Sequence, residues 1–130
     1  MKKQEIIKYW IDSSDDNYKS MPNMFKAGEY IWSLFIGHLV IEKLLKAYYV
    51  KMVGSNVPRT HDLLKLATDA DMNLDEAQKD TLQYITLFNI ETRYEEYKRD
   101  FYMKCNGEFV EKNIRMIEVM RAWLNEKIKK

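Results

Sequence analysis

The sequence predicts an all-α fold, an antiparallel up-and-down bundle of four main helices plus one short helix. Apolar side chains recur at three- and four-residue steps through most of the chain, which is the period of an amphipathic helix. Glycine (4) and proline (2) are scarce, whereas folds made of many tight turns need both. The length of 130 residues suits one hydrophobic core, so we expect a single domain over residues 1–130.

The first helix is expected over residues 3–27. Its apolar face is formed by Ile6, Ile7, Trp10, Tyr18, Met21 and Phe25, with Ser14 on the same face. Pro22 falls inside this segment and is expected to kink it, because proline removes a backbone donor and crowds the preceding turn. Gly28 is a natural terminator.

The second helix is expected over residues 29–53 and is apolar on almost every side. Such a helix must be covered on most faces, either by other helices or by a second copy of the chain. A bundle this small is not expected to cover one set of apolar residues, Ile31, Phe35, Leu39, Leu45 and Tyr49, together with a second set, Trp32, Ile36, Val40 and Tyr48. The sequence therefore predicts a homodimer whose interface uses part of this helix or the neighbouring loop.

Three further helical segments are expected. Thr60 is the predicted N-cap of a short helix over residues 61–70, and Asp75 the N-cap of the next helix. The apolar side of that next helix consists of Ala77, Thr81, Tyr84, Ile85 and Phe88. Between residues 89 and 107 the periodicity fades, which predicts a functional loop with one irregular helical turn. A clean period returns over residues 108–129 and predicts the last helix.

Composition excludes several classes of protein. Lys and Arg total 21 against 20 Asp and Glu, so the net charge gives no global attraction to nucleic acid or anionic membrane. The single cysteine, Cys105, allows neither an internal disulfide nor a zinc pattern. The most apolar stretch, 31–41, is too short to span a bilayer. We expect a cytoplasmic protein that needs no cofactor and no metal.

Several short motifs in a fixed order resemble the HEPN family. They are Trp10 and Asp16 in the first helix, Gly-Glu-Tyr at 28–30, Glu-Lys-Leu-Leu-Lys-Ala at 42–47, Thr-His-Asp-Leu at 60–63, and Arg93-Tyr94. The resemblance implies a bundle of four or five helices, usually a homodimer, often paired with a minimal nucleotidyltransferase. Many family members are metal-independent ribonucleases or toxins that use an Arg followed, after four to six residues, by a His.

The chain departs from that ribonuclease motif. If Arg93 is the family's arginine, the histidine should stand at 98, 99 or 100, which hold Lys98, Arg99 and Asp100. Neither lysine nor arginine accepts a proton at neutral pH, whereas cleavage through the 2′-hydroxyl needs such a group. We therefore assign no catalytic residues and favour a protein that is not an enzyme.

The candidate ligand-binding residues, for a nucleotide or a phosphate, are Arg93, Tyr94, Lys46, Glu42 and His61. His38, Glu42 and Lys46 follow one another at four-residue steps and share one helix face. This face is interpreted as a buried hydrogen-bonded network, with a polar pocket as the alternative. Arg93 is expected to pair with Glu42 or to cap the C-terminal carbonyls of its helix, with Tyr94 filling the end of the bundle. Otherwise it is expected to bind an anion while Tyr94 stacks on a base.

Three functions are consistent with these patterns. The leading hypothesis is a dimeric, non-catalytic HEPN-like module that binds nucleotide or RNA and acts with a nucleotidyltransferase partner. The first alternative is a toxin-type ribonuclease whose proton-transfer group is His61 or comes from the second subunit. The second alternative is a protein-interaction scaffold that binds no ligand.

Overall fold

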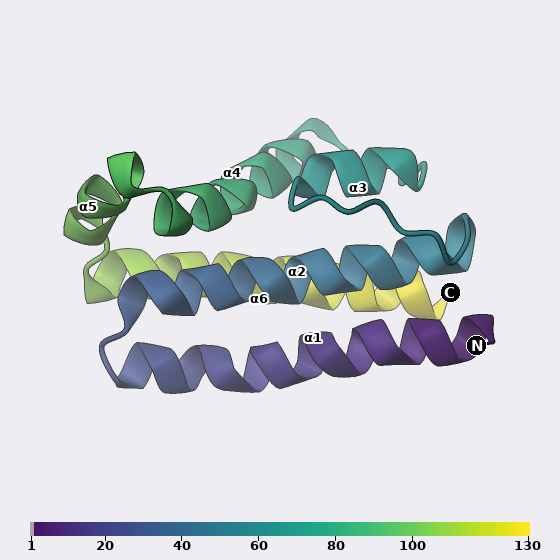
Figure 1. Cartoon of the computed structure of the whole chain (residues 1–130), viewed down its shortest axis with the longest axis horizontal. Coiled ribbons are helices and arrows are strands. Elements are labelled where there is room, and N and C mark those ends of the chain that lie inside the picture. The colour runs from purple at the N-terminus through teal and green to yellow at the C-terminus, as the bar shows by residue number, and fades with distance from the viewer. Residues whose placement is uncertain (1) are drawn as a thin grey trace.

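The computed structural model describes residues 2–130, and these residues form six helices and no strand (Figure 1). In chain order the helices are α1 (Lys3–Lys26), α2 (Tyr30–Met52), α3 (Leu63–Asp69), α4 (Glu76–Arg93), α5 (Glu95–Lys104) and α6 (Gly107–Lys129). The predicted all-α bundle is confirmed. It has one helix more than the sequence predicts.

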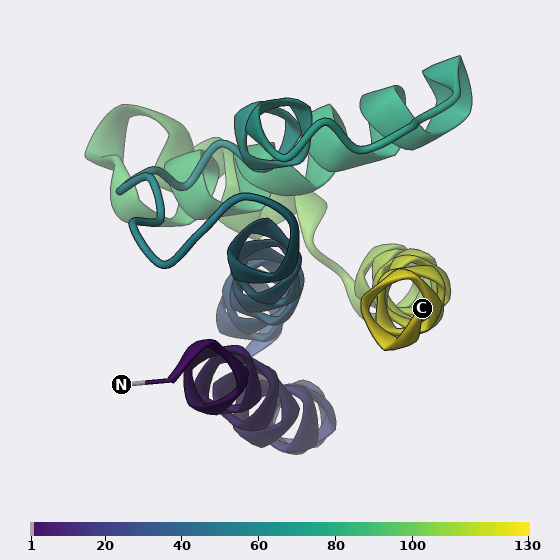
Figure 2. The same ribbon diagram turned by 90° about the vertical axis from the view of Figure 1, so that its right-hand side faces the viewer.

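Helix α2 is the centre of the bundle. It contacts each of the other five helices, and the end-on view places it between α1, α6 and the layer made by α3 and α4 (Figure 2). Its buried side chains therefore lie around the whole helix, and Leu34, Ile41 and Leu44 are fully buried. A single copy of the chain covers most of this helix. Of the apolar residues expected to lack cover, Ile31, Val40 and Leu45 are buried, Phe35, Ile36, Leu39, Tyr48 and Tyr49 are half-buried, and Trp32 is 37% exposed. The argument that coverage alone requires a dimer is thus wrong.

Gly37 brings three helices close together at the middle of α2. A Cβ atom at this position would lie 2.5 Å from Ile117 Cδ1 on α6 and 3.2 Å from Met21 Sδ on α1. Because glycine has no Cβ, α1 and α6 can both approach α2 here.

Helix α1 continues through Pro22 to Lys26, and Gly28 follows with a φ of +79°. The buried Ser14 Oγ donates a hydrogen bond to the Val40 carbonyl oxygen at 2.8 Å, which fixes α1 against α2. Arg121 on α6 donates to Asp15 on α1 at 3.2 Å.

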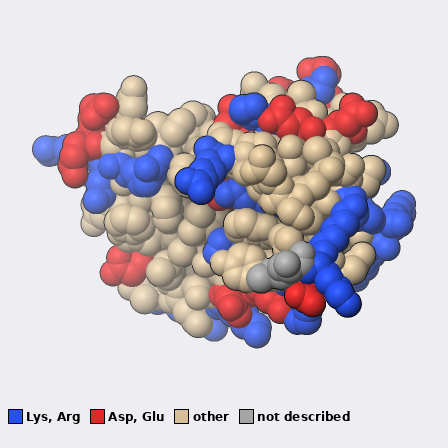
Figure 3. All heavy atoms as spheres, turned by 45° about the vertical axis from the view of Figure 1, so that its right-hand side comes forward, with Lys and Arg blue, Asp and Glu red and all other residues tan. Residues whose placement is uncertain are grey.

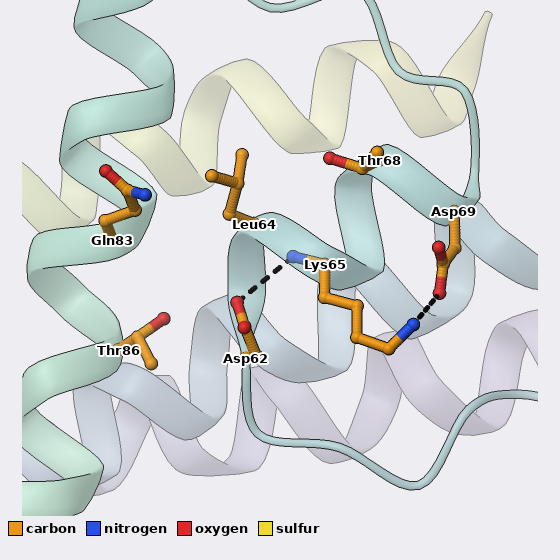
Figure 4. Close-up of a pocket in the computed structure, with 7 residues that line it drawn as sticks. All are labelled: Asp62, Leu64, Lys65, Thr68, Asp69, Gln83 and Thr86. Carbon is orange, nitrogen blue, oxygen red and sulfur yellow. Dashed lines mark hydrogen bonds and ion pairs between the residues drawn. The ribbon is translucent and has the colours of Figure 1, made fainter.

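Helix α3 begins two residues later than expected. Asp62, and not Thr60, is its N-cap, and the carboxylate Oδ1 accepts a hydrogen bond from the Lys65 backbone N–H at 3.1 Å (Figure 4). A carboxylate is at least as good an N-cap as a hydroxyl and also interacts favourably with the helix dipole. Thr60 Oγ1 accepts from the Asp62 N–H instead, so His61 lies in the loop before the helix.

Helix α4 starts as expected, with Asp75 and Gln78 forming a reciprocal capping box. The expected loop over 89–107 is wrong, because α4 continues to Arg93 and α5 follows after Tyr94 alone leaves the helical conformation. The apolar period fades there because two positions on the buried face are polar, Asn89 and Thr92. The last helix, α6, agrees with the prediction and is capped by the Asn106 side chain.

Candidate functional site

The predicted ladder of His38, Glu42 and Lys46 exists on α2, with the Glu42 carboxylate at its centre. Glu42 is only 4% exposed, and its Oε2 accepts a hydrogen bond from Lys46 Nζ at 2.9 Å. Residues four apart in a helix lie one above the other, so this pair follows directly from the spacing. We refer to Glu42, His38, Lys46 and His61 as the Glu42 cluster.

His61 joins the cluster from the loop before α3. Its Nδ1–H donates to Glu42 Oε1 at 2.7 Å, while the side chain stays 53% exposed. Because Nδ1 carries the donated proton, Nε2 of the neutral ring is an acceptor, and no group within residues 2–130 forms a hydrogen bond to it. The buried carboxylate therefore orients an imidazole whose other nitrogen is free.

His38 lies beneath this pair and is fully buried. Its Nε2–H donates to the His61 carbonyl oxygen at 2.9 Å, which ties the loop to α2. Its Nδ1 has no hydrogen-bond partner and lies 3.8 Å from Glu42 Oε1, too far for a hydrogen bond. Burial lowers the pKa of His38 below its ordinary value, against the opposing effects of the His61 carbonyl and the Glu42 charge. His38 is accordingly the neutral Nε2–H tautomer at pH 7.

Two opposing effects set the charge of Glu42. Burial raises the pKa of this carboxyl, but hydrogen bonds from His61 and Lys46, together with the Lys46 charge, outweigh burial and leave the pKa below its ordinary value. Glu42 is therefore ionised at neutral pH and neutralised by the Lys46 ammonium. This agrees with the interpretation of the ladder as a buried, hydrogen-bonded network.

Arg93 does not pair with Glu42, so that expectation is wrong. Its Nε–H donates to Asn89 Oδ1 at 2.6 Å, one helical turn earlier on α4, and its guanidinium carbon lies 5.3 Å from the centre of the Tyr94 ring. Both Glu42 oxygens are already taken by His61 and Lys46. The predicted site residues therefore separate into two groups, the Glu42 cluster and the Arg93–Tyr94 pair.

Arg93 and Tyr94 are followed on α5 by further aromatic and basic side chains. Tyr94, Tyr97 and Tyr102 are 46%, 52% and 67% exposed. Lys98 Nζ lies 5.2 Å from the centre of the Trp32 ring. We call Arg93, Tyr94, Tyr97, Lys98 and Tyr102 the α5 surface. Glu95, Glu96 and Asp100 lie on the same helix and lower its net charge.

Sequence reasoning missed two contacts at these sites. Lys46 Nζ lies 5.2 Å from the centre of the Trp10 ring, which links the Glu42 cluster to α1. Asn89, the partner of Arg93, falls in the segment expected to be a loop. The four-residue step from Asn89 to Arg93 is the signal that could have identified this pair.

The hollow between α3 and α4 has a volume of about 380 Å³ (Figure 4). Its charged side chains are already paired: Lys65 binds Asp69 at 2.8 Å, and Asp62 caps α3. It offers a ligand no free charge of its own.

No group of three or more His, Cys, Asp or Glu side chains suited to a metal ion occurs in residues 2–130. Burial raises the pKa of the Cys105 thiol to about 12, with a further contribution from the Glu91 charge, so this cysteine is not an activated nucleophile. None of the helices in the described part of the chain has the length and hydropathy required to cross a membrane.

Comparison with known proteins gives the family. The family model of the HEPN domain matches residues 7–127. The chain belongs to the HEPN family. Among solved structures, this HEPN chain is similar to that of TT1696 from Thermus thermophilus, with a TM-score of 0.78 and 18% sequence identity. The similarity covers 93% of this chain and 97% of that chain, and at this identity it shows a shared fold. No curated protein matches the HEPN chain.

Proposed function

We propose that this HEPN module binds RNA or a nucleotide at the α5 surface and does not catalyse a reaction there. The observation that carries the proposal is that Arg93 has no carboxylate partner in the described part of the chain. Arg93 is exposed as a residue, its guanidinium is held by the Asn89 side-chain oxygen and the Tyr94 ring, and no carboxylate within residues 2–130 forms an ion pair with it.

An arginine with this geometry can bind a phosphate. Asn89 occupies the Nε–H, so the terminal N–H groups remain for an anion, and guanidinium binds phosphate through two parallel hydrogen bonds. The exposed Tyr94 and Tyr97 rings offer flat faces for unpaired bases, and stacking of this kind contributes about 1–3 kcal/mol per base. A single-stranded segment or a nucleotide fits this chemistry better than a duplex.

A thermal-shift experiment with a short single-stranded RNA tests the proposal. The RNA is expected to raise the melting temperature of the wild type, because a ligand that binds only the folded state stabilises it by mass action. Arg93→Ala should abolish this shift. It also leaves the buried Asn89 Oδ1 without its hydrogen bond, which lowers the free energy of unfolding by about 1–3 kcal/mol, so the RNA-induced shift is measured from each protein's own ligand-free melting temperature. Arg115→Ala, the same change at an exposed arginine on α6, is the matched control and should retain the shift.

Equal RNA-induced shifts in Arg93→Ala and Arg115→Ala would contradict the proposed site. If no RNA or nucleotide shifts the wild type, the scaffold alternative is favoured.

A ribonuclease centred on His61 is a second candidate, favoured by the 2.7 Å hydrogen bond from its Nδ1 to the buried Glu42. Carboxylate-oriented imidazoles with a free Nε2 serve as general bases in hydrolytic enzymes. The family's own histidine is absent, however, and Lys98, Arg99 and Asp100 occupy the α5 positions where it would stand. RNA recovered from the binding experiment in EDTA should therefore be intact. Cleavage that disappears in His61→Ala would establish this second candidate.

We also propose that the module is a homodimer and acts with a nucleotidyltransferase, as the family resemblance implies. Trp32 is exposed on α2 next to Lys98, which supports an interface that uses part of α2 or the neighbouring segment. Light scattering at micromolar concentration should give twice the mass of the 15.7 kDa chain. A monomer mass at that concentration would contradict the dimer.

A further inference from the structure

A separate pocket lies at the other end of α2 from the α5 surface. It occupies the space between the first half of α1, the second half of α2 and the loop at 55–59 that follows α2, and it has a volume of about 420 Å³. The ends of these segments meet at the side of the bundle opposite α5 (Figure 1). The residues that matter for its chemistry are Tyr9, Trp10, Lys46, Ser55, Asn56 and Arg59. The volume lies within the range of pockets that bind small molecules.

The two charged residues that line the pocket are both cations, and the ion pair with Glu42 neutralises one of them, Lys46. The other is Arg59, and no aspartate or glutamate lines the pocket. Lys46 Nζ gives one hydrogen bond to Glu42, which leaves other N–H groups of the ammonium available. Arg59 is exposed and forms no ion pair or hydrogen bond through its side chain within residues 2–130. On this face, most carboxylates lie towards the edges, with basic and uncharged side chains between them (Figure 3).

Two aromatic rings stand beside these cations. Tyr9 is 61% exposed, and its ring meets the Trp10 ring edge to face, with centroids 5.3 Å apart. Lys46 Nζ lies 5.2 Å from the centre of the Trp10 ring. A flat heteroaromatic ligand can therefore pack against an aromatic side chain while its charged group stays within reach of Lys46. Ser55 and Asn56 add polar groups that can bind a sugar or the edge of a base.

We propose that this pocket binds a nucleoside monophosphate, with the base against Trp10 and Tyr9 and the phosphate between Arg59 and Lys46. A phosphate monoester carries a charge of about −2 near neutral pH. Arg59 supplies a positive charge that is unpaired in the described chain, and Lys46, which is paired with Glu42, supplies N–H donors. The inference goes beyond RNA binding at the α5 surface, because the two sites share no residue.

Titration calorimetry with adenosine 5′-monophosphate tests the pocket. The wild type should bind it, and Arg59→Ala should weaken binding at least about tenfold, the effect of one hydrogen bond between charged groups. Arg59→Lys should recover part of the affinity because it restores the charge. The α5 surface is itself proposed to bind a nucleotide, so Arg59→Ala is also compared with its parent in the Arg93→Ala background, where the Arg59-dependent binding should persist. Arg115→Ala, at an exposed arginine outside both sites, is the control and should bind the monophosphate as the wild type does. Arg59 lies on an exposed loop, and circular dichroism should show an unchanged fold.

Adenosine and inorganic phosphate separate the two halves of the proposed site, and each alone should bind more weakly than the monophosphate. The inference is overturned if the wild type shows no binding at millimolar monophosphate, if Arg59→Ala binds as tightly as the wild type, or if inorganic phosphate binds as tightly as the monophosphate. Arg59-dependent binding in a protein that shows no RNA shift would support the pocket while the proposed RNA function fails.

Discussion

Glu42→Ala is expected to lower the free energy of unfolding by about 3–5 kcal/mol at pH 7, because breaking a buried charge pair strands its partner. The carboxylate is 4% exposed and accepts hydrogen bonds from Lys46 and His61. Without it, the Lys46 ammonium, whose side chain is 13% exposed, loses its counter-charge, and His61 loses the group that holds it against α2. Urea unfolding followed by circular dichroism measures the loss.

The chain contains a matched control for this variant. Glu111 accepts a hydrogen bond from Arg115 at 2.9 Å, again four residues apart on a helix, but its side chain is 59% exposed. Glu111→Ala should change the free energy of unfolding by no more than about 0.5 kcal/mol, because solvent screens exposed pairs. Similar losses in the two variants would show that burial of Glu42 is not what makes its pairing important.

The helices that carry a full apolar face could be predicted from the sequence. The last helix and the capping box at Asp75 follow from local rules, namely a 3.6-residue period and a side chain that accepts from the first turn. Helix α5 was missed because only Phe101 of its residues is buried, so its sequence shows no apolar stripe. A helix with one buried residue, stabilised mainly by tertiary packing, shows no clear hydrophobic periodicity in its sequence.

At the candidate site, too, contacts within one helix could be predicted from the sequence, whereas contacts between segments could not. The contact of Lys46 with Glu42 was predictable because both residues lie on one helix face. The contact of His61 with Glu42 was not, since it depends on the path of the loop that joins α2 to α3, and loop paths are set by tertiary contacts. The predicted Arg93–Glu42 pair failed for a related reason. Local pairing with Asn89 on the same helix was available at no cost in chain entropy, and Glu42 already had two partners.

Acidification is expected to destabilise the wild type in two stages, and His38 accounts for the first. Burial lowers the pKa of His38 in the folded protein from its ordinary value of 6.5, with the charges of His61 and Arg93 acting in the same direction against that of Glu42. Below pH 6.5 the unfolded chain therefore binds a proton that the folded chain does not, and stability falls until the folded pKa is reached. Glu42, whose folded pKa lies below 4.5, loses its contribution only as the pH falls further, through that folded pKa.

His38→Gln isolates the first stage. The glutamine Nε2 can replace the histidine Nε2–H as donor to the His61 carbonyl oxygen, but glutamine does not titrate. Between pH 7.5 and 5.5 the wild type should therefore lose more free energy of unfolding than His38→Gln, by at most about 1.4 kcal/mol, the limit for one proton over one pH unit below 6.5. The comparison is made by urea unfolding at both pH values. Parallel losses in the two proteins would mean that His38 takes up a proton equally in the folded and unfolded states. The unpaired Nδ1 would then have to gain a partner on protonation, and Glu42 Oε1, 3.8 Å away, is the candidate.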